Sequence, residues 1–307
     1  MTSSSDTKRF VVTEALHGLP LDRVLRTLAG VSWGDARNFV ARGKVTVAGV
    51  LAKDSVRRVS RGDTIEINPR ARKAKDSAAL DRSALVYVDP HIVVVEKPPG
   101  ISTVPYEPGE RGTLEQLVAA ILPRAHEKGP PSSLGVVQRL DKETSGLLVF
   151  ARTFAAKKVL AAQLRQRTVE RRYLAIVHGH PKKQRFESYL LKDRGDGLRG
   201  TSRIGREGQL AITDVDPLKR LEGAELVTCR LTTGRTHQIR IHLAEAGYPL
   251  VGERVYVRNY AGELLAAPRP MLHAAELGFV HPVKGQAMRF ESPLPSDMAA
   301  MIAKLGG

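Results

Sequence analysis

The run from Leu134 to Phe150 begins and ends with apolar residues, and a polar segment with four charges of mixed sign separates them. Apolar stretches bounded by turn-forming residues are typical of buried strands. The pattern therefore predicts a short polar loop between two strands, with Asp141 in the loop. Gly146 follows the polar residues and can adopt backbone angles that few other residues accept. Such a loop fixes a reactive side chain on a rigid frame, although a plain hairpin with a polar tip gives the same pattern.

The first part of the chain shows helical spacing followed by strand-like alternation. Ser32 can cap a second helix, and Gly43 can end it. Segments 44–51 and 63–67 alternate like strands. The first helix is predicted by apolar residues at helical spacing: Leu21, Val24, Leu25 and Leu28.

Two helices are predicted further along. Apolar residues four apart over 156–164 indicate one helix, which Thr153 can cap. Apolar residues over 239–246 indicate a short helix that Gly247 closes, and its first turn carries Arg240.

Shifts in composition divide the chain into four parts. We expect a polar N-terminal segment over 1–18, a small α+β domain over 19–68, a linker over 69–82 and a large domain over 83–307. The linker assignment depends on charges and small residues without apolar periodicity.

Composition limits the class of protein. The chain has 307 residues, 42% of them hydrophobic, and no apolar run near the length of a membrane span. Its start is polar and does not resemble a signal peptide. The lone Cys229 cannot form an internal disulfide, which suits a reducing compartment, and it reads most simply as a small buried residue. We therefore expect a cytoplasmic protein without a membrane partner, and a monomer by default.

The formal net charge of +16 favours a polyanionic partner, and RNA is the natural candidate. The basic segment 165–206 holds twelve basic and four acidic residues, an excess of eight. A solvated face would give a similar pattern, but the size of the local excess favours an RNA-binding surface. A second basic group lies in the first domain: Arg23, Arg26, Arg37, Arg42, Lys44, Arg57, Arg58 and Arg61.

Several kinds of chemistry lack their usual motifs. The chain has no Gly-Lys-Ser phosphate loop, no Gly-x-Ser-x-Gly elbow and no Cys-x-x-Cys pair. His237 and His242 are five residues apart, a spacing that does not suit two ligands of one metal. We expect no metal and no cofactor. An ionised carboxylate that acts as nucleophile or base remains, and Arg139 can share a face with Asp141 in an extended segment.

The polar loop resembles a family signature. Residues 138–146 read Gln-Arg-Leu-Asp-Lys-Glu-Thr-Ser-Gly, similar to the His-Arg-Leu-Asp-x-x-Thr-Ser-Gly signature of the RluA-type pseudouridine synthases. Gln138 departs from the usual His, which puts a supporting contact in question rather than the chemistry. Further segments resemble that family in order: 93–101, 171–179, 233–242 and 272–282. The first domain resembles a small RNA-binding domain shared with a ribosomal small-subunit protein, although a generic α+β cap is the alternative.

The resemblance implies a fold and a reaction. The fold would be α+β, a mixed and mostly antiparallel sheet with flanking helices. The reaction would isomerise uridine in RNA to pseudouridine, with Asp141 as the essential carboxylate that attacks ribose, attacks uracil or removes a proton. Tyr173 would stack on the target base. Arg240 would pair with Asp141 and favour its ionised form, with Arg235 as the alternative partner.

The remaining expectations concern contacts with RNA. Arg139 would serve the extruded nucleotide or its phosphate, and the other substrate contacts would come from Thr144, Arg235, His237 and Gln238. Arg171 and Arg172 would join five basic residues of the first domain in binding RNA: Arg23, Arg26, Arg37, Arg42 and Lys44. Large-subunit ribosomal RNA is the favoured substrate. The alternatives are transfer RNA, a non-catalytic RNA-binding or ribosome assembly protein, and a hydrolase that uses Asp141.

Overall fold

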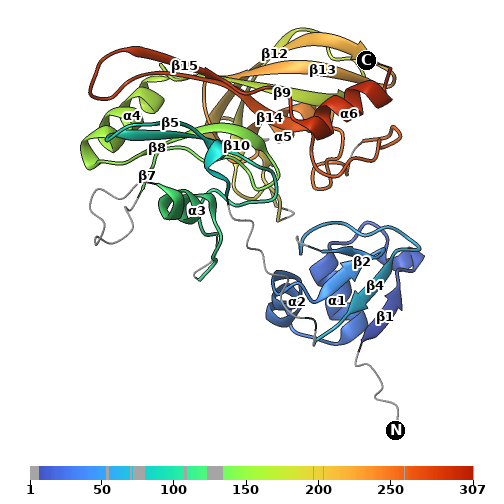
Figure 1. Ribbon diagram of the computed structural model, residues 1–307. Helices are drawn as coiled ribbons and strands as arrows, with labels where there is room; N and C mark the ends of the chain where they lie inside the picture. The colour runs from blue at the N-terminus through green and yellow to red at the C-terminus, as the bar shows by residue number, and fades with distance from the viewer. Residues whose placement is uncertain are drawn as a thin grey trace. The chain divides into compact units, whose positions relative to one another are not determined.

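The chain folds into two compact units, Met1–Ala78 and Ala79–Gly307. This computed structural model describes residues 7–52, 55–69, 71, 80–106, 109–122, 134–195, 197–202, 204–258 and 260–306. Each unit is described by itself, and Figure 1 gives the labels of the elements.

The first unit is a small sheet packed on two helices. Its helices are η1 (Glu14–Leu16), α1 (Leu21–Ala29) and α2 (Trp33–Ala41). Its strands are β1 (Lys8–Val11), β2 (Val45–Val47), β3 (Val50–Leu51) and β4 (Thr64–Ile67), paired antiparallel in the order β1-β4-β2-β3. Leu21, Val24 and Leu25 of α1 are fully buried against β2 and β4, which confirms the predicted helical face.

The predicted caps of this unit are confirmed, but two boundaries are wrong. The Ser32 hydroxyl accepts a hydrogen bond from the Asp35 backbone N–H at 3.1 Å and caps α2. The segment 44–51 is two strands, because Ala48 and Gly49 both have positive φ and form a turn. Within the predicted N-terminal segment 1–18, the described residues 7–18 are not separate from the domain. Residues 8–11 form β1, which pairs with β4, and Leu16 is buried in the core.

The second unit is built on a long mixed sheet. Its helices are η2 (Arg82–Ala84), α3 (Leu114–Ile121), α4 (Phe154–Gln166), α5 (Gln238–Glu245) and α6 (Ser296–Lys304). Its strands are β5 (Leu85–Val88), β6 (Ile92–Lys97), β7 (Gly135–Val136), β8 (Ser145–Ala151), β9 (Glu170–His178), β10 (Gln184–Leu191), β11 (Gly200–Thr201), β12 (Gln209–Leu221), β13 (Ala224–Leu231), β14 (Leu272–Val280) and β15 (Ala287–Glu291). The predicted linker 69–82 lies largely outside the described residues, and Leu80 is already part of this unit's core.

One parallel pairing joins two antiparallel halves of this sheet. The strand order among the described residues is β11-β10-β12-β13-β9-β14-β8-β6-β5, with β15 on β14 and β7 on β8. All neighbours are antiparallel except β14 and β8, which pair at His273 with Ser145 and at Ala274 with Gly146. The mixed, mostly antiparallel sheet confirms the predicted fold class.

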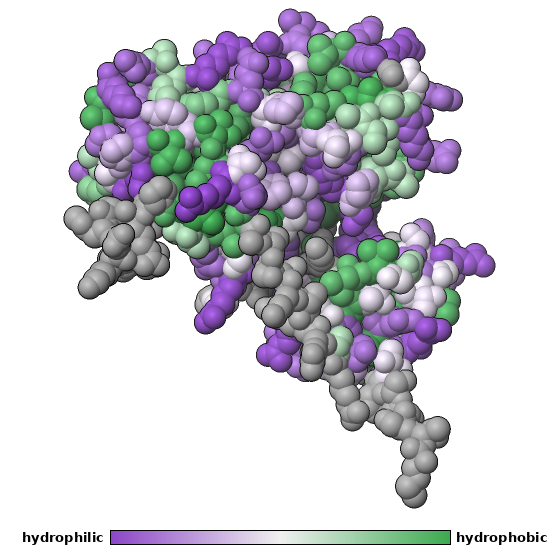
Figure 2. Space-filling model, in the orientation of Figure 1, coloured by the Kyte–Doolittle hydropathy of each residue, from purple (hydrophilic) through white to green (hydrophobic). Residues whose placement is uncertain are grey.

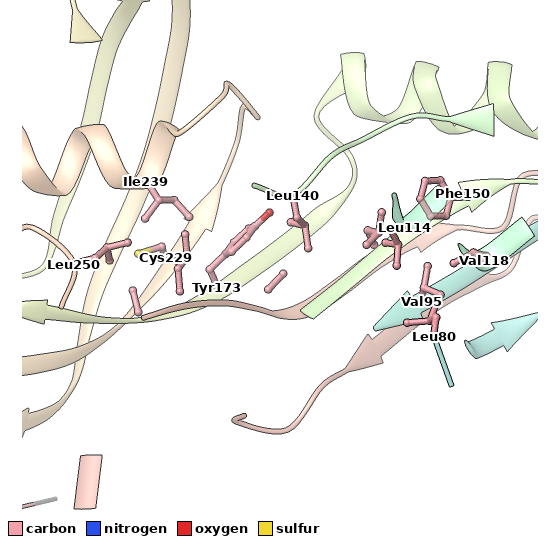
Figure 3. Close-up of a cluster of buried hydrophobic side chains, with 14 of the residues drawn as sticks. Leu80, Val95, Leu114, Val118, Leu140, Phe150, Tyr173, Cys229, Ile239 and Leu250 are labelled. Carbon is pink, nitrogen blue, oxygen red and sulfur yellow. The ribbon is translucent and has the colours of Figure 1, made fainter. Parts of the chain in front are cut away.

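Helices cover both faces of the sheet because its strands alternate between two cores. On β6, Val93 and Val95 face the core that contains α3 and α5, whereas Ile92 and Val94 face the core that contains α4. Helix α6 packs on the far half of this second face. In Figure 3 the side chains of Leu140 and Tyr173 lie between the two ends of the first core.

The predicted elements around Asp141 are present with one difference. Residues 137–144 form the loop, and β8 behind it is buried along its whole length. The strand before the loop, β7, has only two residues and is half-buried. Thr153 caps α4 by accepting from the Ala156 N–H, and α5 carries Arg240 in its first turn, as predicted.

Hydrophilic residues cover much of the visible surface of each unit, with apolar patches between them (Figure 2). Among the residues that the structure describes, no helix combines the length and the apolar character needed to cross a membrane.

Gly146 is required by the parallel junction. Its φ is +109°, and a Cβ at this position would lie 2.2 Å from the Ala274 carbonyl oxygen. We predict that Gly146→Ala lowers the free energy of unfolding by about 3 kcal/mol or more, because backbone strain and a backbone clash add. Urea denaturation measures this change.

Gly285→Ala is the matched control for this prediction. Gly285 also has positive φ (+68°), but a Cβ there meets nothing within 4 Å. We expect this variant to lose only about 1 kcal/mol. Equal losses in the two variants would contradict the structural role of the junction.

Candidate active site

The Asp141 loop is fixed by Thr103 on one side. The Thr103 hydroxyl donates to the Leu140 carbonyl at 2.8 Å and accepts from the Leu140 N–H at 3.1 Å. Both groups are buried, so this reciprocal pair is shielded from water. Leu140 packs into the core, and Asp141 follows with its side chain 22% exposed.

Lys97 holds the other side of the loop from the end of β6. Its side chain is fully buried at the end of β6, and its Nζ donates to the carbonyl oxygens of Lys142, Ile101 and Pro98 at 2.8, 2.8 and 3.0 Å. Burial lowers the pKa of Lys97 to about 7, and the negative charges of Glu143 and Asp141 oppose that shift. The lysine thus ties the turn after β6 to the turn after Asp141.

Arg269 connects the same loop to β14 and α6. Its guanidinium donates to the carbonyl of Glu143 at 3.1 Å and to the hydroxyl of Ser145 at 3.1 Å. It also forms an ion pair with Asp297 at 2.7 Å. Ser145 in turn is hydrogen-bonded to His273 Nδ1 at 3.0 Å, across the parallel junction.

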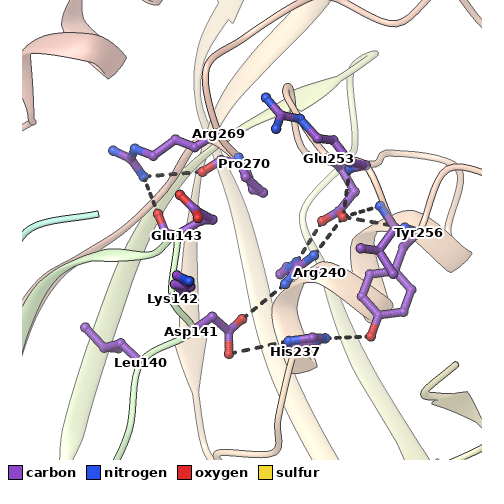
Figure 4. Close-up of polar contacts among 12 residues, drawn as sticks. Leu140, Asp141, Lys142, Glu143, His237, Arg240, Glu253, Tyr256, Arg269 and Pro270 are labelled. Atoms are coloured by element: carbon purple, nitrogen blue, oxygen red, sulfur yellow. Dashed lines mark hydrogen bonds and ion pairs between the residues drawn. The ribbon is translucent and has the colours of Figure 1, made fainter. Parts of the chain in front are cut away.

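Two carboxylates flank Arg240, as Figure 4 shows, and they differ in their exposure to solvent. Arg240 Nε and Nη2 each donate to a Glu253 carboxylate oxygen at 2.8 Å, and the Glu253 side chain is fully buried. The third guanidinium nitrogen, Nη1, lies 3.7 Å from Asp141 Oδ2. Burial acts to raise the pKa of Glu253, but the charge and hydrogen bonds of Arg240 outweigh it and hold this pKa well below its ordinary value.

His237 lies on the other side of Asp141. It has a left-handed backbone conformation just before α5, and its Nδ1 lies 2.7 Å from the Tyr256 hydroxyl. Its Nε2 lies 3.9 Å from Asp141 Oδ1, too far for a hydrogen bond. Burial lowers the pKa of His237, which favours a neutral imidazole. Burial also raises the pKa of Tyr256, whose ring lies 5.3 Å from the Arg240 guanidinium carbon.

Tyr173 reaches the same region from β9. It pairs with Cys229 of β13 on one side and with Ala274 of β14 on the other. Its side chain is largely buried beside Leu140, and burial raises its pKa to about 12. The phenol is therefore protonated at neutral pH.

The structure brings some predicted site residues together and separates others. Asp141, His237 and Arg240 meet, and Tyr173 belongs to the adjoining core. Thr144 is buried, and its N–H donates to the Asp141 carbonyl at 3.1 Å. Arg139 is exposed, and within the described chain no ion pair joins it to Asp141.

Gln238 is fully engaged within the protein, and Arg235 is not the partner of Asp141. The Gln238 amide donates to Ile212 O and Thr213 Oγ1 and accepts from Thr233 Oγ1 and the Arg235 N–H. These four bonds use its full capacity, so it is unavailable to a substrate. Arg235 Nε donates to the Leu210 carbonyl at 3.0 Å, and it is Arg240 that adjoins Asp141.

The basic segment 165–206 offers fewer free cations to RNA than its net charge implies. Arg171 is partly buried and donates to the carbonyls of Leu231 and Thr232. Arg172 forms an ion pair with Glu276 at 2.8 Å. Neither is the free surface cation that the sequence predicted, because both groups have partners within the protein. In the first unit Arg23, Arg26, Arg37 and Arg42 are exposed, and Lys44 is half-buried.

Sequence reasoning missed four residues of this site: Lys97, Glu253, Tyr256 and Arg269. Lys97 lay within a recognised segment, 93–101, but its role was not identified. The others lie in residues 252–270, which have no apolar periodicity to indicate an inward face. Within the described ranges, no group of three or more His, Cys, Asp or Glu residues could hold a metal ion.

Comparisons with known proteins give consistent matches. The family described as RNA pseudouridylate synthase matches residues 91–245. A ribosomal large subunit pseudouridine synthase D from Zymomonas mobilis is 34% identical, over 97% of this chain and 98% of its own. An uncharacterised RNA pseudouridine synthase from Bacillus subtilis is 34% identical over 88% of both chains. Among solved structures, human RNA pseudouridylate synthase domain containing 4 has a TM-score of 0.58 at 22% identity, covering 73% of this chain and 93% of that one, which shows a shared fold.

The Arg240–Glu253 pair should account for most of the stability that this region loses at acid pH. We predict that Glu253→Gln lowers the free energy of unfolding by about 3–5 kcal/mol at neutral pH, because it removes one partner of a buried ion pair. A carboxyl with a depressed folded pKa contributes stability above its ordinary value, here 4.5, and loses it as the pH falls further. The difference between the native protein and the variant should therefore narrow below about pH 4.5.

Urea denaturation across this pH range measures the effect, with Glu187→Gln as the control. Glu187 is exposed and lies 4.0 Å from Arg185, so its loss should change stability by less than about 0.5 kcal/mol. If the difference in the free energy of unfolding between the native protein and Glu253→Gln did not change with pH, the proposed electrostatic origin of that difference would be excluded.

Proposed function

This chain belongs to the RNA pseudouridylate synthase family, whose members are isomerases that act on RNA, and we propose that it modifies uridines of large-subunit ribosomal RNA. The relative from Zymomonas mobilis bears that substrate in its name and aligns with nearly the whole chain, both units included. Transfer RNA is the second candidate, because other relatives are described only as RNA pseudouridine synthases.

The proposed reaction is an isomerisation, so its atoms balance without another reactant. The bond between uracil N1 and ribose C1′ breaks, and a bond between uracil C5 and C1′ forms. A proton leaves C5, and one is added to N1. The protein must extrude the nucleotide, provide a carboxylate, and retain the detached uracil while it turns.

One observation carries the assignment of Asp141 as the catalytic carboxylate. Of the two acids that adjoin Arg240, Glu253 is fully buried and both its oxygens accept hydrogen bonds. Asp141 is partly exposed, and the nearest nitrogens of the Arg240 guanidinium and of the neutral His237 ring lie 3.7 and 3.9 Å from its oxygens. Its oxygens are oriented by positive charge but not saturated by it, which leaves a lone pair for ribose, for uracil or for a proton.

The neighbouring groups are proposed to position the reactants. Arg240 orients Asp141, and Glu253 fixes Arg240, so a charge near the reacting atoms needs little reorganisation. Tyr173 offers a protonated phenol and a ring face at the floor of the site for the uracil. Arg139 is exposed on the same loop and is proposed to contact the extruded nucleotide or its phosphate.

The first unit is proposed to bind RNA, as its resemblance to a ribosomal small-subunit domain implies. Exposed Arg23 and Arg26 lie on α1, and exposed Arg42 follows α2. Positive groups on a small domain attract phosphates at long range and favour association of a large polyanion.

The catalytic proposal predicts that Asp141→Asn lowers the rate of pseudouridine formation at least about a thousandfold, because an amide is neither nucleophile nor base at neutral pH. Asp214→Asn, at a half-buried acid on β12 that pairs with Arg185 of β10, should leave the rate unchanged. A tritium-release assay on ribosomal RNA from cells that lack the gene measures both. Full activity of Asp141→Asn would refute the assignment, and release of free uracil would indicate a hydrolase.

The substrate proposal predicts which modifications disappear when the gene is deleted. Pseudouridines should be lost at positions of large-subunit ribosomal RNA and should return with the native gene but not with Asp141→Asn. Transcriptome-wide mapping of pseudouridine measures this. Loss confined to transfer RNA would reject the ribosomal substrate and keep the enzyme class.

A further inference from the structure

An exposed tryptophan lies beside exposed arginines of α1 and α2 in the first unit. Trp33 is the first residue of α2, its relative exposure is 41%, and it is the only tryptophan of the chain. Large aromatic rings normally bury most of their surface, and their exposure is therefore informative. The hydrophobic core of the unit does not include this ring.

Two guanidinium groups lie over the Trp33 ring, one from each helix. The Cζ atoms of Arg26 on α1 and Arg37 on α2 are 4.9 and 5.8 Å from the ring centroid. Both distances are within the range of cation–π attraction. The ring is therefore in contact with two basic side chains that are eleven residues apart in the sequence, at positions 26 and 37.

The two arginines differ in how firmly they are held. Arg37 Nε is bonded to Asp22 Oδ2 at 3.1 Å, and Asp22 is buried. Arg26 is exposed, and no acidic side chain among the described residues pairs with it. Arg37 is thus a fixed part of the site, whereas Arg26 can leave the ring without breaking an ion pair.

This arrangement fits a ligand with both a flat apolar face and negative charge. An acidic peptide would use the arginines but has no need of the ring. An unpaired nucleotide uses both, since its base can stack on the indole and its phosphate can take the guanidinium. Bases within a duplex are already stacked on each other and do not offer a free face.

We propose that Trp33 is a stacking site for an unpaired base of RNA, with Arg26 turning from the ring to an adjacent phosphate and Arg37 remaining in place. This inference rests on the proposed RNA substrate, and it adds a contact in the first unit that reads single-stranded structure. The site would let the enzyme distinguish unpaired segments of its RNA from helical ones.

Because Trp33 is the sole tryptophan, its fluorescence reports this site directly. The probe is single-stranded oligoadenylate, which contains no uridine and is not a substrate. We expect oligoadenylate to quench Trp33 emission and to shield the ring from acrylamide. An abasic strand with the same number of phosphates should bind more weakly and quench little, and an RNA duplex of equal length should behave like the abasic strand.

Variants separate stacking from charge, with affinity read from the anisotropy of labelled oligoadenylate. Trp33→Ala should weaken binding roughly tenfold. Trp33→Phe should show only part of this loss of affinity. Arg26→Ala should reduce the salt dependence of binding by about one phosphate contact. Arg61→Ala is the matched control: Arg61 is exposed but paired with Glu14 at 3.0 Å, so its removal should leave quenching intact.

Two results would overturn the inference. Equal quenching by the abasic strand would show that charge alone places RNA near the ring. Protection of Trp33 from acrylamide in the free protein would show that the ring is already covered by the chain itself. All measurements use the full chain with Asp141→Asn, which we predict to be unable to turn over RNA. A failure here therefore leaves the catalytic proposal untouched, and an active Asp141→Asn would count against that proposal alone.

Discussion

The candidate site depends on the interaction of one buried arginine with two carboxylates. Arg240 is almost fully buried, and an isolated charge in that position would be costly. Glu253 neutralises it through two hydrogen bonds of 2.8 Å and is itself held by the backbone N–H groups of Arg254 and Val255. The remaining guanidinium nitrogen faces Asp141 without forming a close bond. Because Glu253 neutralises Arg240, the three groups together keep one negative charge, at Asp141, which is the only one of the two acids that is open to solvent.

The sheet explains how Asp141 is held in place. The loop that carries it enters β8 at the parallel pairing with β14, where the two antiparallel halves meet. The charged groups of Lys97 and Arg269 both donate hydrogen bonds to carbonyls of the loop, and the Thr103 hydroxyl forms hydrogen bonds with the backbone of Leu140. Buried cations used this way are structural parts of the site, because they replace the water that a loop would otherwise bind.

Local signals in the sequence were sufficient for much of this fold. Ser32 and Thr153 cap helices where their spacing predicted, and Arg240 lies in the first turn of α5. These features depend on residues within one or two turns of each other. The turn at Ala48 was missed because two strands joined without polar residues look like one alternating strand. The N-terminal strand β1 was missed for a similar reason, since its four residues are too few to show a period.

Long-range partners could not be read in the same way. Glu253 is thirteen residues from Arg240 in a segment without periodicity, and Gln238 looked like a substrate ligand until its four partners were placed. Charge counts misled in the same manner: Arg172, Lys183 and Arg185 belong to the basic segment but face Glu276, Asp216 and Asp214. Paired cations release few counterions when RNA binds, so the net charge of +16 overstates the attraction of that segment. A phosphate therefore gains most binding free energy at cations without acidic partners, such as Arg26.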